Sequence, residues 1–313
     1  DLNYSNINDT SAGVFDLKEY LDVTAPINGA PVTATDPYTI TWDRYGNGVT
    51  SVILQYSKDG GSNWNYVNTV SPYTVSNSGS YLWTVPADAL SQTAQIRVSD
   101  PGNANAVDTG TNFWIKGEIT VTAPAGTESW NVGSSQEIAW TKKGNIPTVN
   151  TYYSADNGST WSAIGSGISG TSPWSWSIPG STTLTILGKI KVEDAAFSTV
   201  YGVSANNFEI KGNVYNVTIA PLVGGVLTYA GASSSFNVSW DYQGAISTVQ
   251  VYYSTDGGTT YPPANLLGEV SAALKPATFN VPNAIGTNVR IKVAAKSNPN
   301  VYGESSVFAI KGS

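Results

Sequence analysis

The chain has 313 residues, 12% of them charged and 41% hydrophobic, and it contains no Cys, Met or His. Without thiols and imidazoles it lacks disulfides, cysteine nucleophiles, histidine bases and the His and Cys ligands of zinc sites. A net charge of −7 with no basic run disfavours nucleic acid as a partner. No apolar stretch reaches the roughly 20 residues that a membrane span requires.

Residues 1–18 precede the first complete repeat. They close on Phe15–Lys18, and a similar Phe-x-Ile-Lys segment returns 98 residues later at Phe113–Lys116. This spacing predicts that residues 1–18 are the closing strands of a preceding repeat whose earlier strands lie upstream. The other hypothesis is a free strand that completes a neighbouring subunit by strand addition.

Three blocks then repeat one order of short segments. Each block opens with an alternating segment that runs into Pro, continues with a strand that ends in Trp, and closes on Lys-Gly. The strand tryptophans, Trp42, Trp140 and Trp240, are 98 and 100 residues apart, which is the length of a whole domain. The predicted repeats are residues 19–117, 118–212 and 213–313.

Each block consists of short alternating runs rich in Val, Ile, Thr, Tyr and Trp, separated by clusters of Gly, Pro, Asn, Asp and Ser. None shows a sustained helical period. The pattern predicts an all-β fold of tandem immunoglobulin-like or fibronectin-III-like β-sandwiches, each with seven antiparallel strands. In the second block the strands are expected near 119–123, 135–141, 147–154, 160–164, 173–178, 187–193 and 204–211.

The joints between blocks are short, Gly117-Glu118 in one case and Gly212–Val214 in the other. Such joints limit bending between neighbouring domains. We therefore expect the array to transmit orientation from one repeat to the next.

A hairpin motif, Ser-x-Asp-x-Gly-x-x-aromatic, occurs once in each block, at residues 57–64, 154–161 and 254–261. It is similar to the Asp box of sialidase propellers, but propeller blades repeat at about 40–50 residues, half the spacing found here. We therefore favour a structural role. The Asp accepts hydrogen bonds from turn amides, the Gly adopts a positive φ, and the aromatic ring packs over the hairpin.

Taken together, these motifs resemble the immunoglobulin-like domains of the Kre9/Knh1-like family. In the second block the resemblance rests on Ile119–Pro124, Trp140, Ser154–Trp161, Trp174–Pro179 and Ile190–Asp194. The first block matches closely at Tyr81–Pro86 and Ile96–Asp100, whereas the third departs at Tyr261, Phe279–Pro282 and Ala295. The resemblance implies a secreted or wall-associated module without catalytic activity.

Calcium is the one cofactor for which the sequence offers candidate ligands. The loop from Asp100 to Asp108 offers carboxylate and amide oxygens, which suit a hard cation. The third block has Ala295 and Lys296 at the corresponding place, and these cannot ligate calcium. Solvated loop acids are therefore the favoured interpretation, with Asp100 and Asp108 as the metal candidates if a site exists.

Aromatic residues are the candidates for interaction. Ten Trp and 18 Tyr exceed the needs of three small cores, and exposed rings suit protein contacts or stacking on sugars. The interaction candidates are Trp64, Trp114, Trp130, Trp161 and Trp174. Five Asn-x-Ser/Thr sequons are glycosylation candidates in a secreted protein. They are Asn3, Asn8, Asn157, Asn216 and Asn237.

The sequence singles out no carboxylate pair of the kind that a glycosidase requires, and we expect a chain without enzymatic activity. The predicted function is that of an extracellular structural module, a segment of a tandem-repeat cell-surface, filament or surface-lattice (S-layer) protein. Its expected partners are other copies of itself, and polysaccharide is a further candidate partner for adhesion. The alternative hypothesis is an accessory carbohydrate-binding array of a secreted hydrolase.

Overall fold

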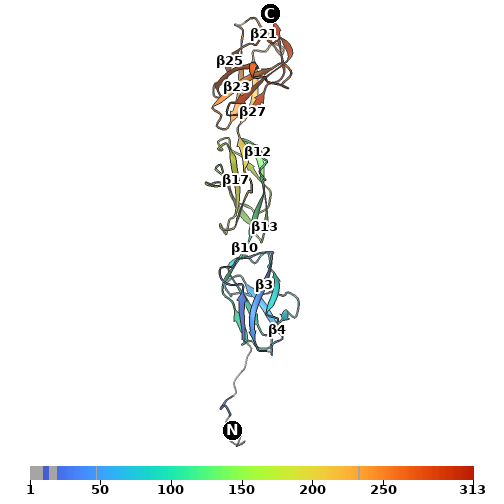
Figure 1. Cartoon of the computed structure of the whole chain (residues 1–313), viewed down its shortest axis with the longest axis vertical. Helices are drawn as coiled ribbons and strands as arrows, with labels where there is room; N and C mark the ends of the chain where they lie inside the picture. The colour runs from blue at the N-terminus through green and yellow to red at the C-terminus, as the bar shows by residue number, and fades with distance from the viewer. Residues whose placement is uncertain (1–9, 14–19, 47, 232) are drawn as a thin grey trace. The chain divides into compact units, whose positions relative to one another are not determined.

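The computed structural model describes residues 10–13, 20–46, 48–231 and 233–313. Apart from one short 3₁₀ helix, η1 (Pro263–Asn265), their regular elements are all strands, which confirms the predicted all-β fold (Figure 1). No helix in these residues is long and apolar enough to cross a membrane. The closing strands predicted within residues 1–18 lie almost wholly outside the described residues.

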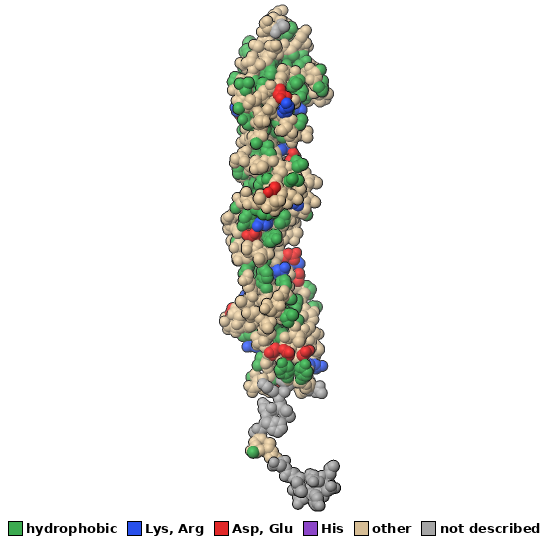
Figure 2. Space-filling model, turned by 60° about the vertical axis from the view of Figure 1, so that its left-hand side comes forward, with side chains coloured by type: hydrophobic (Ala, Val, Ile, Leu, Met, Phe, Trp, Pro, Cys, Tyr) green, Lys and Arg blue, Asp and Glu red, His purple; other side chains and the backbone are tan. Residues whose placement is uncertain are grey.

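The strands form six sheets, two from each of three successive stretches of the chain. By their internal contacts, the residues group into two compact units, 1–119 with 142–146 and 120–141 with 147–313. The exact residue limits of the three repeats remain a prediction. On the face shown in Figure 2, charged side chains are scattered among polar ones without a continuous basic patch.

The first sandwich pairs a three-stranded sheet, β1-β3-β7, with a larger sheet of order β2-β10-β8-β4-β5, in which β6 pairs with β4 and β9 with β8. Its strands are β1 (Tyr20–Ala25), β2 (Val32–Thr33), β3 (Pro37–Tyr45), β4 (Ser51–Ser57), β5 (Asn65–Tyr66), β6 (Thr74–Ser76), β7 (Ser80–Thr84), β8 (Ser91–Ser99), β9 (Val107–Thr109) and β10 (Phe113–Lys116).

The second sandwich repeats this plan with sheets β11-β13-β16 and β12-β19-β17-β14-β15, and β18 pairs with β17. Its strands are β11 (Glu118–Ala123), β12 (Ser129–Asn131), β13 (Ser135–Lys143), β14 (Thr148–Ser154), β15 (Ser162–Ser169), β16 (Trp174–Ser177), β17 (Thr185–Asp194), β18 (Tyr201–Val203) and β19 (Phe208–Lys211).

The third sandwich has sheets β20-β22-β25 and β21-β28-β26-β23-β24, and β27 pairs with β26. Its strands are β20 (Asn213–Ala220), β21 (Val226–Tyr229), β22 (Ser235–Gln243), β23 (Thr248–Ser254), β24 (Leu266–Ser271), β25 (Ala277–Asn280), β26 (Gly286–Ala295), β27 (Asn298–Glu304) and β28 (Phe308–Gly312).

Each core forms because the strands alternate buried apolar and exposed polar residues, as the sequence pattern predicts. The strand tryptophans Trp42, Trp140 and Trp240 are all buried, with 1–4% of their surface exposed. Buried aliphatic and aromatic side chains surround Trp42 and Trp240 in continuous clusters. Because the chain has no cysteine, no disulfide joins the sheets, and burial of these apolar side chains is the main force that holds them together.

The second sandwich has nine strands where the sequence pattern predicted seven, all antiparallel. The additional strands are β12 and β18, and β12 pairs in parallel with β19, so that Trp130 lies opposite Ile210. Equivalent parallel pairs join β2 to β10 and β21 to β28. Strands of three residues are too short to produce a clear alternation, which is why the pattern did not reveal them.

Candidate interaction surfaces

The Ser-x-Asp-x-Gly hairpin closes in the same way in all three sandwiches. In the second, Ser154 Oγ donates to Asp156 Oδ1 (2.7 Å) and accepts from the Gly158 amide (2.8 Å), while the Thr160 amide donates to Asp156 Oδ1 (2.8 Å). The same contacts recur around Asp59 and Asp256. The predicted structural role of this motif is confirmed.

These hydrogen bonds stabilise the ionised carboxylates of the turns. They lower the pKa of Asp59 to about 2, chiefly through the side chain and amide of Asn63. They lower the pKa of Asp156 to about 2, chiefly through Thr160 and Ser154, and they also lower that of Asp256. In the described part of the chain, each carboxyl group with a shifted pKa has a lowered pKa. A glycosidase general acid requires the opposite shift.

A cation lies over the hairpin aromatic in every sandwich. Strand register places Arg97, Lys191 and Lys292 at equivalent positions on β8, β17 and β26. The distances from cation to ring centre are 4.2 Å for Arg97 over Trp64, 5.6 Å for Lys191 over Trp161, and 5.2 Å for Lys292 over Tyr261. Contacts of this kind contribute about 0.5–1 kcal/mol at exposed sites.

The second sandwich extends this contact into a cluster. Lys191 also lies 4.2 Å from the ring centre of Tyr152 and 5.6 Å from that of Tyr201. Its Nζ is 2.8 Å from Glu193 Oε2, and the Tyr152 hydroxyl donates to Glu193 Oε1 at 3.2 Å. The cation and carboxylate are therefore already satisfied within the chain.

The rings of Trp64 and Trp161 are also in contact with the turn beneath them. A Cβ added at Gly61 would lie 3.6 Å from Trp64 Cζ2, and one added at Gly158 would lie 3.3 Å from Trp161 Cζ2. Each ring thus packs on its own glycine turn and faces its own cation. Both tryptophans are half-buried, which reduces the ring surface available to stack on a sugar.

The other three interaction candidates differ in their surroundings. The structure places Trp130 in the core, 6% exposed, with its ring centre 4.7 Å from that of Phe208. Trp174 is half-buried over Gly165, where an added Cβ would lie 3.0 Å from its ring. Trp114 is half-buried, and its buried Nε1 has no hydrogen-bond partner among the described residues. None of the three presents a fully exposed ring.

Asp100 and Asp108 each bind a backbone amide of the first sandwich. Asp100 Oδ1 accepts from Gly102 N (2.7 Å), which closes the β8–β9 turn. Asp108 Oδ2 accepts from Val23 N (2.8 Å), which ties β9 to the opening strand β1. Over the described residues, no cluster of three or more His, Cys, Asp or Glu side chains could hold a metal ion.

The sequons are placed as follows. Asn157 and Asn216 are exposed and have positive φ angles of 60° and 53°. Asn216 Nδ2 donates to Asp241 at 3.0 Å. Asn237 is half-buried in β22 and accepts from Thr278 Oγ1 at 2.8 Å. Asn3 and Asn8 lie outside the described residues.

In the first unit, a glycine-lined joint follows β10. A Cβ added at Gly117 would lie 2.8 Å from Ile146 Cδ1, so this position has no room for a side chain. Gly144, at φ +83°, is equally confined. A Cβ there would lie 2.9 Å from Leu90 and 3.2 Å from Ala34. All five residues belong to the first unit.

An ion pair borders this joint. Lys143 Nζ lies 3.0 Å from Asp36 and 3.1 Å from Glu118, and all three belong to the first unit. The hydrogen bonds to Asp36 and then Glu118 raise the pKa of Lys143. Because all three side chains are well exposed, solvent screens these ion pairs and they contribute little to stability.

The second unit contains the same joint after β19. A Cβ added at Gly212 would lie 2.8 Å from Ile246 Cδ1. One added at Gly244, at φ +89°, would lie 3.1 Å from Leu184 and 3.3 Å from Val132. Each residue stands at the position of its counterpart in the first unit, so the contact is repeated in detail.

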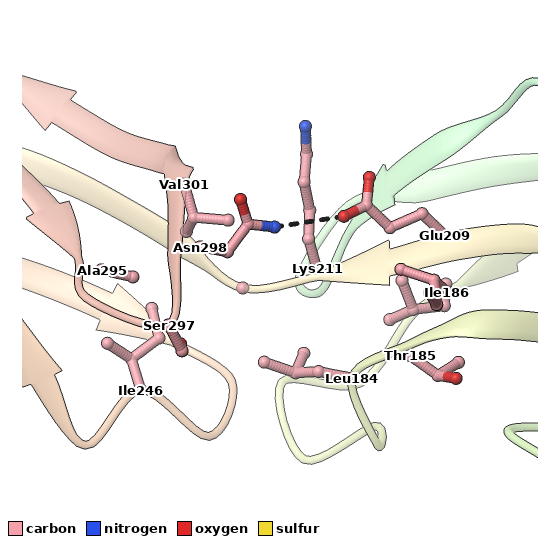
Figure 3. A pocket seen from close by; sticks show the side chains of 12 residues that line it. Leu184, Thr185, Ile186, Glu209, Lys211, Ile246, Ala295, Ser297, Asn298 and Val301 are labelled. Atoms are coloured by element: carbon pink, nitrogen blue, oxygen red, sulfur yellow. Dashed lines mark hydrogen bonds between the residues drawn. The ribbon is translucent and has the colours of Figure 1, made fainter.

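A pocket of about 200 Å³ lies beside this second joint (Figure 3). Leu184, Ile246 and Val301 supply apolar side chains, and Asn298 Nδ2 donates to Glu209 Oε1 across its rim at 3.2 Å. The short joints are evident in the sequence, whereas the pairing of the glycines and this pocket are not. The recurrence of Gly-x-Ile after the strand tryptophan is the signal that could have revealed them.

These features define a tandem immunoglobulin-like β-sandwich protein with repeated joints. Residues 25–115 match the family model of the Kre9/KNH-like N-terminal Ig-like domain, which confirms the family resemblance for the first sandwich. No curated protein matches the chain.

Solved structures of similar fold include tandem domain arrays. The chicken CNTN1 FN1-FN3 domains are 13% identical, with 90% of this chain and 100% of that one covered and a TM-score of 0.24. The N-terminal four Ig domains of Dscam1 isoform 8.4 are 11% identical, with 96% and 74% covered and a TM-score of 0.31. The Clostridium thermocellum CbhA fibronectin(III)-like modules are 11% identical, with 61% and 94% covered and a TM-score of 0.21.

Proposed function

We propose that this chain is a non-catalytic structural module of a secreted or cell-surface protein, a tandem-repeat segment of a filament, surface lattice or stalk. The observation that carries the proposal is the repeated joint. In each joint one glycine packs against an Ile and the other against a Leu, and neither glycine position has room for a side chain. Packing of this kind resists bending, because a bend has to separate or compress close contacts.

The resemblance to the Kre9/KNH-like domain supports a secreted or surface location for the module. The hairpin aromatics offer less support to the carbohydrate-binding alternative, because Trp64 and Trp161 already face cations of their own sandwich. Assembly with other copies remains part of the proposal.

Stiffness of the second joint is directly testable. Since the chain has no native Cys, spin labels attached at Ser175→Cys and Asn280→Cys, both exposed, report the distance between the second and third sandwiches. We expect a narrow distance distribution by double electron–electron resonance. Gly212→Val should broaden or shift it, because the added atoms meet Ile246 Cδ1 and, at 3.0 Å, the carbonyl oxygen of Gln243. Overpacking of this kind costs about 1–3 kcal/mol.

Gly286→Val is the matched control, since a Cβ at this strand position meets nothing within 4 Å. It should leave the distribution unchanged. A broad distribution in the labelled parent, or a Gly212→Val protein that behaves like the parent, would refute a stiff joint.

A further inference from the structure

A pocket of about 310 Å³ opens on the second sandwich. Its lining comes from the hairpin turn, from β15 and from the loop that follows β16. Tyr153 is 6% exposed and Trp176 is 3% exposed, so both rings lie deep, whereas Ser162, Ser181 and Thr183 are exposed. The pocket is therefore a hollow with an aromatic floor and a rim that carries hydroxyl groups.

The first sandwich bridges the corresponding place with an ion pair. Lys58 and Ala155 correspond, because each follows the Ser of the hairpin motif. Asp88 and Ser181 correspond, because each stands two residues after the Pro that follows β7 or β16. Lys58 Nζ donates to the carbonyl oxygen of Asp88 at 2.9 Å and to its Oδ2 at 3.0 Å. Ala155 and Ser181 are too short to form such a bridge.

The third sandwich covers this place in another way. Residues 262–265 separate its hairpin aromatic, Tyr261, from β24, and η1 lies among them. Asn265 Nδ2 donates to the carbonyl oxygen of Tyr253 at 3.1 Å, which holds η1 against the end of β23. In the second sandwich β15 begins directly after Trp161, which leaves no residues for such a cover. The pocket is open in the second sandwich because both coverings are missing.

The third sandwich is already in place beside this pocket. A Cβ added at Gly180, between Pro179 and Ser181 of the lining, would lie 3.8 Å from Gln243 Cγ of that sandwich. The pocket stays open with this neighbour packed against it, and none of its lining residues lines the pocket at the second joint. Its opening therefore does not depend on a repeat outside this sequence.

The lining favours a neutral ligand. Among the described residues, those that line the pocket carry hydroxyl, aliphatic and aromatic groups, and the only ionisable side chain is that of Tyr153. Burial raises the pKa of Tyr153 to about 12, and its hydroxyl donates to the Thr183 carbonyl oxygen at 3.0 Å, so the phenol is uncharged at neutral pH. A charged ligand would lose water here without gaining a counter-ion.

The rim offers the polar contacts that such a ligand requires. The hydroxyl groups of Ser162, Ser181 and Thr182 form no hydrogen bond with other described residues, so each has a donor and acceptor sites available. Ile164 and Pro179 add apolar contacts. Ligand pockets are typically about 300–1,000 Å³, so this one suits a small molecule. A single sugar ring combines small size, several hydroxyl groups and apolar C–H groups.

We propose that this pocket binds one neutral sugar residue, either as a free sugar or at the end of a glycan. The proposal goes beyond the structural function, because it adds a ligand site to the module. It does not depend on the stiffness of the joints.

Titration of the full ¹⁵N-labelled chain with sugars, followed by NMR, tests the site. The probes are glucose, galactose, mannose and N-acetylglucosamine, each up to about 50 mM, which detects Kd values in the millimolar range. At least one should shift the amide signals of Ser162, Ser181 and Thr182 saturably. Glucuronate should bind at least about tenfold more weakly than glucose, because its carboxylate finds no counter-ion. Equal binding of the two would contradict the neutral lining.

A disaccharide with the best-binding sugar at its non-reducing end separates the two sources. Binding at least as tight as that of the single sugar is expected for a glycan end. Weaker binding is expected for a site that takes the free sugar.

Two changes transplant the bridge of the first sandwich. Ala155→Lys combined with Ser181→Asp should close the pocket and weaken binding by at least about tenfold. Thr255→Lys combined with Asn283→Asp is the matched control, because it adds the same two charges at exposed positions of the third sandwich. It should bind like wild type. Ser162→Ala removes one rim hydroxyl and should weaken binding about twofold to tenfold.

Circular dichroism checks that each variant is folded. The absence of a saturable shift with all four neutral sugars, or shifts confined to other parts of the chain, would overturn the proposal. Wild-type affinity of the folded double variant with the transplanted bridge would overturn it too. A chain that binds no sugar but gives a narrow spin-label distribution at the second joint would lose only this site, and the proposed function would stand.

Discussion

Replacing Asn77 by Ala should destabilise the first sandwich selectively. Asn77 is 2% exposed; its Oδ1 accepts from Trp42 Nε1 (2.8 Å), and its Nδ2 donates to the Val49 carbonyl (3.0 Å). The variant leaves the indole N–H buried without its acceptor, at about 1–3 kcal/mol, and the second lost hydrogen bond adds about 1 kcal/mol. The expected total is about 2–4 kcal/mol.

Hydrogen exchange with mass spectrometry measures this effect in the intact chain, because peptides from β3 and β7 report the opening free energy of the first sandwich alone. Peptides from the other two sandwiches serve as internal standards and should not change. A loss below about 1 kcal/mol in the first sandwich would refute the assigned role of the hydrogen bond.

The second sandwich offers a matched comparison. Trp140 Nε1 is buried and has no hydrogen-bond partner among the described residues. Trp42→Phe and Trp140→Phe remove the same atoms, but only the first also removes a hydrogen bond. We expect Trp42→Phe to cost about 1 kcal/mol more than Trp140→Phe. Equal costs would contradict this account.

Two further predictions concern the second sandwich. Because the folded pKa of Asp156 lies near 2, below its ordinary value of 3.8, its hydrogen bonds favour the fold above about pH 4, and this contribution is lost as the pH falls toward 2. The Thr160 amide signal in NMR should therefore titrate near pH 2, and a midpoint near 4 would contradict the turn geometry. Trp176→Ala should cost about 3–5 kcal/mol in hydrogen exchange of β14 and β17, because its 3% exposed ring packs against Tyr153 and Trp130. A cost below about 1 kcal/mol would show that the core refills the cavity.

The repeats, the all-β fold and the burial of Trp42, Trp140 and Trp240 could be predicted because they depend on alternation and on a period, which a single sequence displays directly. The parallel strand that buries Trp130 could not be predicted. Its three residues show no alternation, and its position depends on a closing strand about 80 residues further along the chain.

The cations at Arg97, Lys191 and Lys292 were visible in the sequence, each between an Ile and a Val of the same late strand. Their contact with the hairpin aromatics depends on the register between strands, which the pattern of one strand does not determine. The joint glycines were also visible in the sequence. The reason that no other residue fits at Gly117 and Gly212 becomes evident only when the fold places Ile146 and Ile246 beside them.

The joint also bears on how such a protein can change in length. In each joint, one sandwich supplies the Leu and the closing glycine. The next sandwich supplies the glycine and the Ile of its loop. A genetic duplication or deletion of one whole block therefore leaves every junction with both of its halves. Evolution can adjust the number of blocks without redesigning any of them.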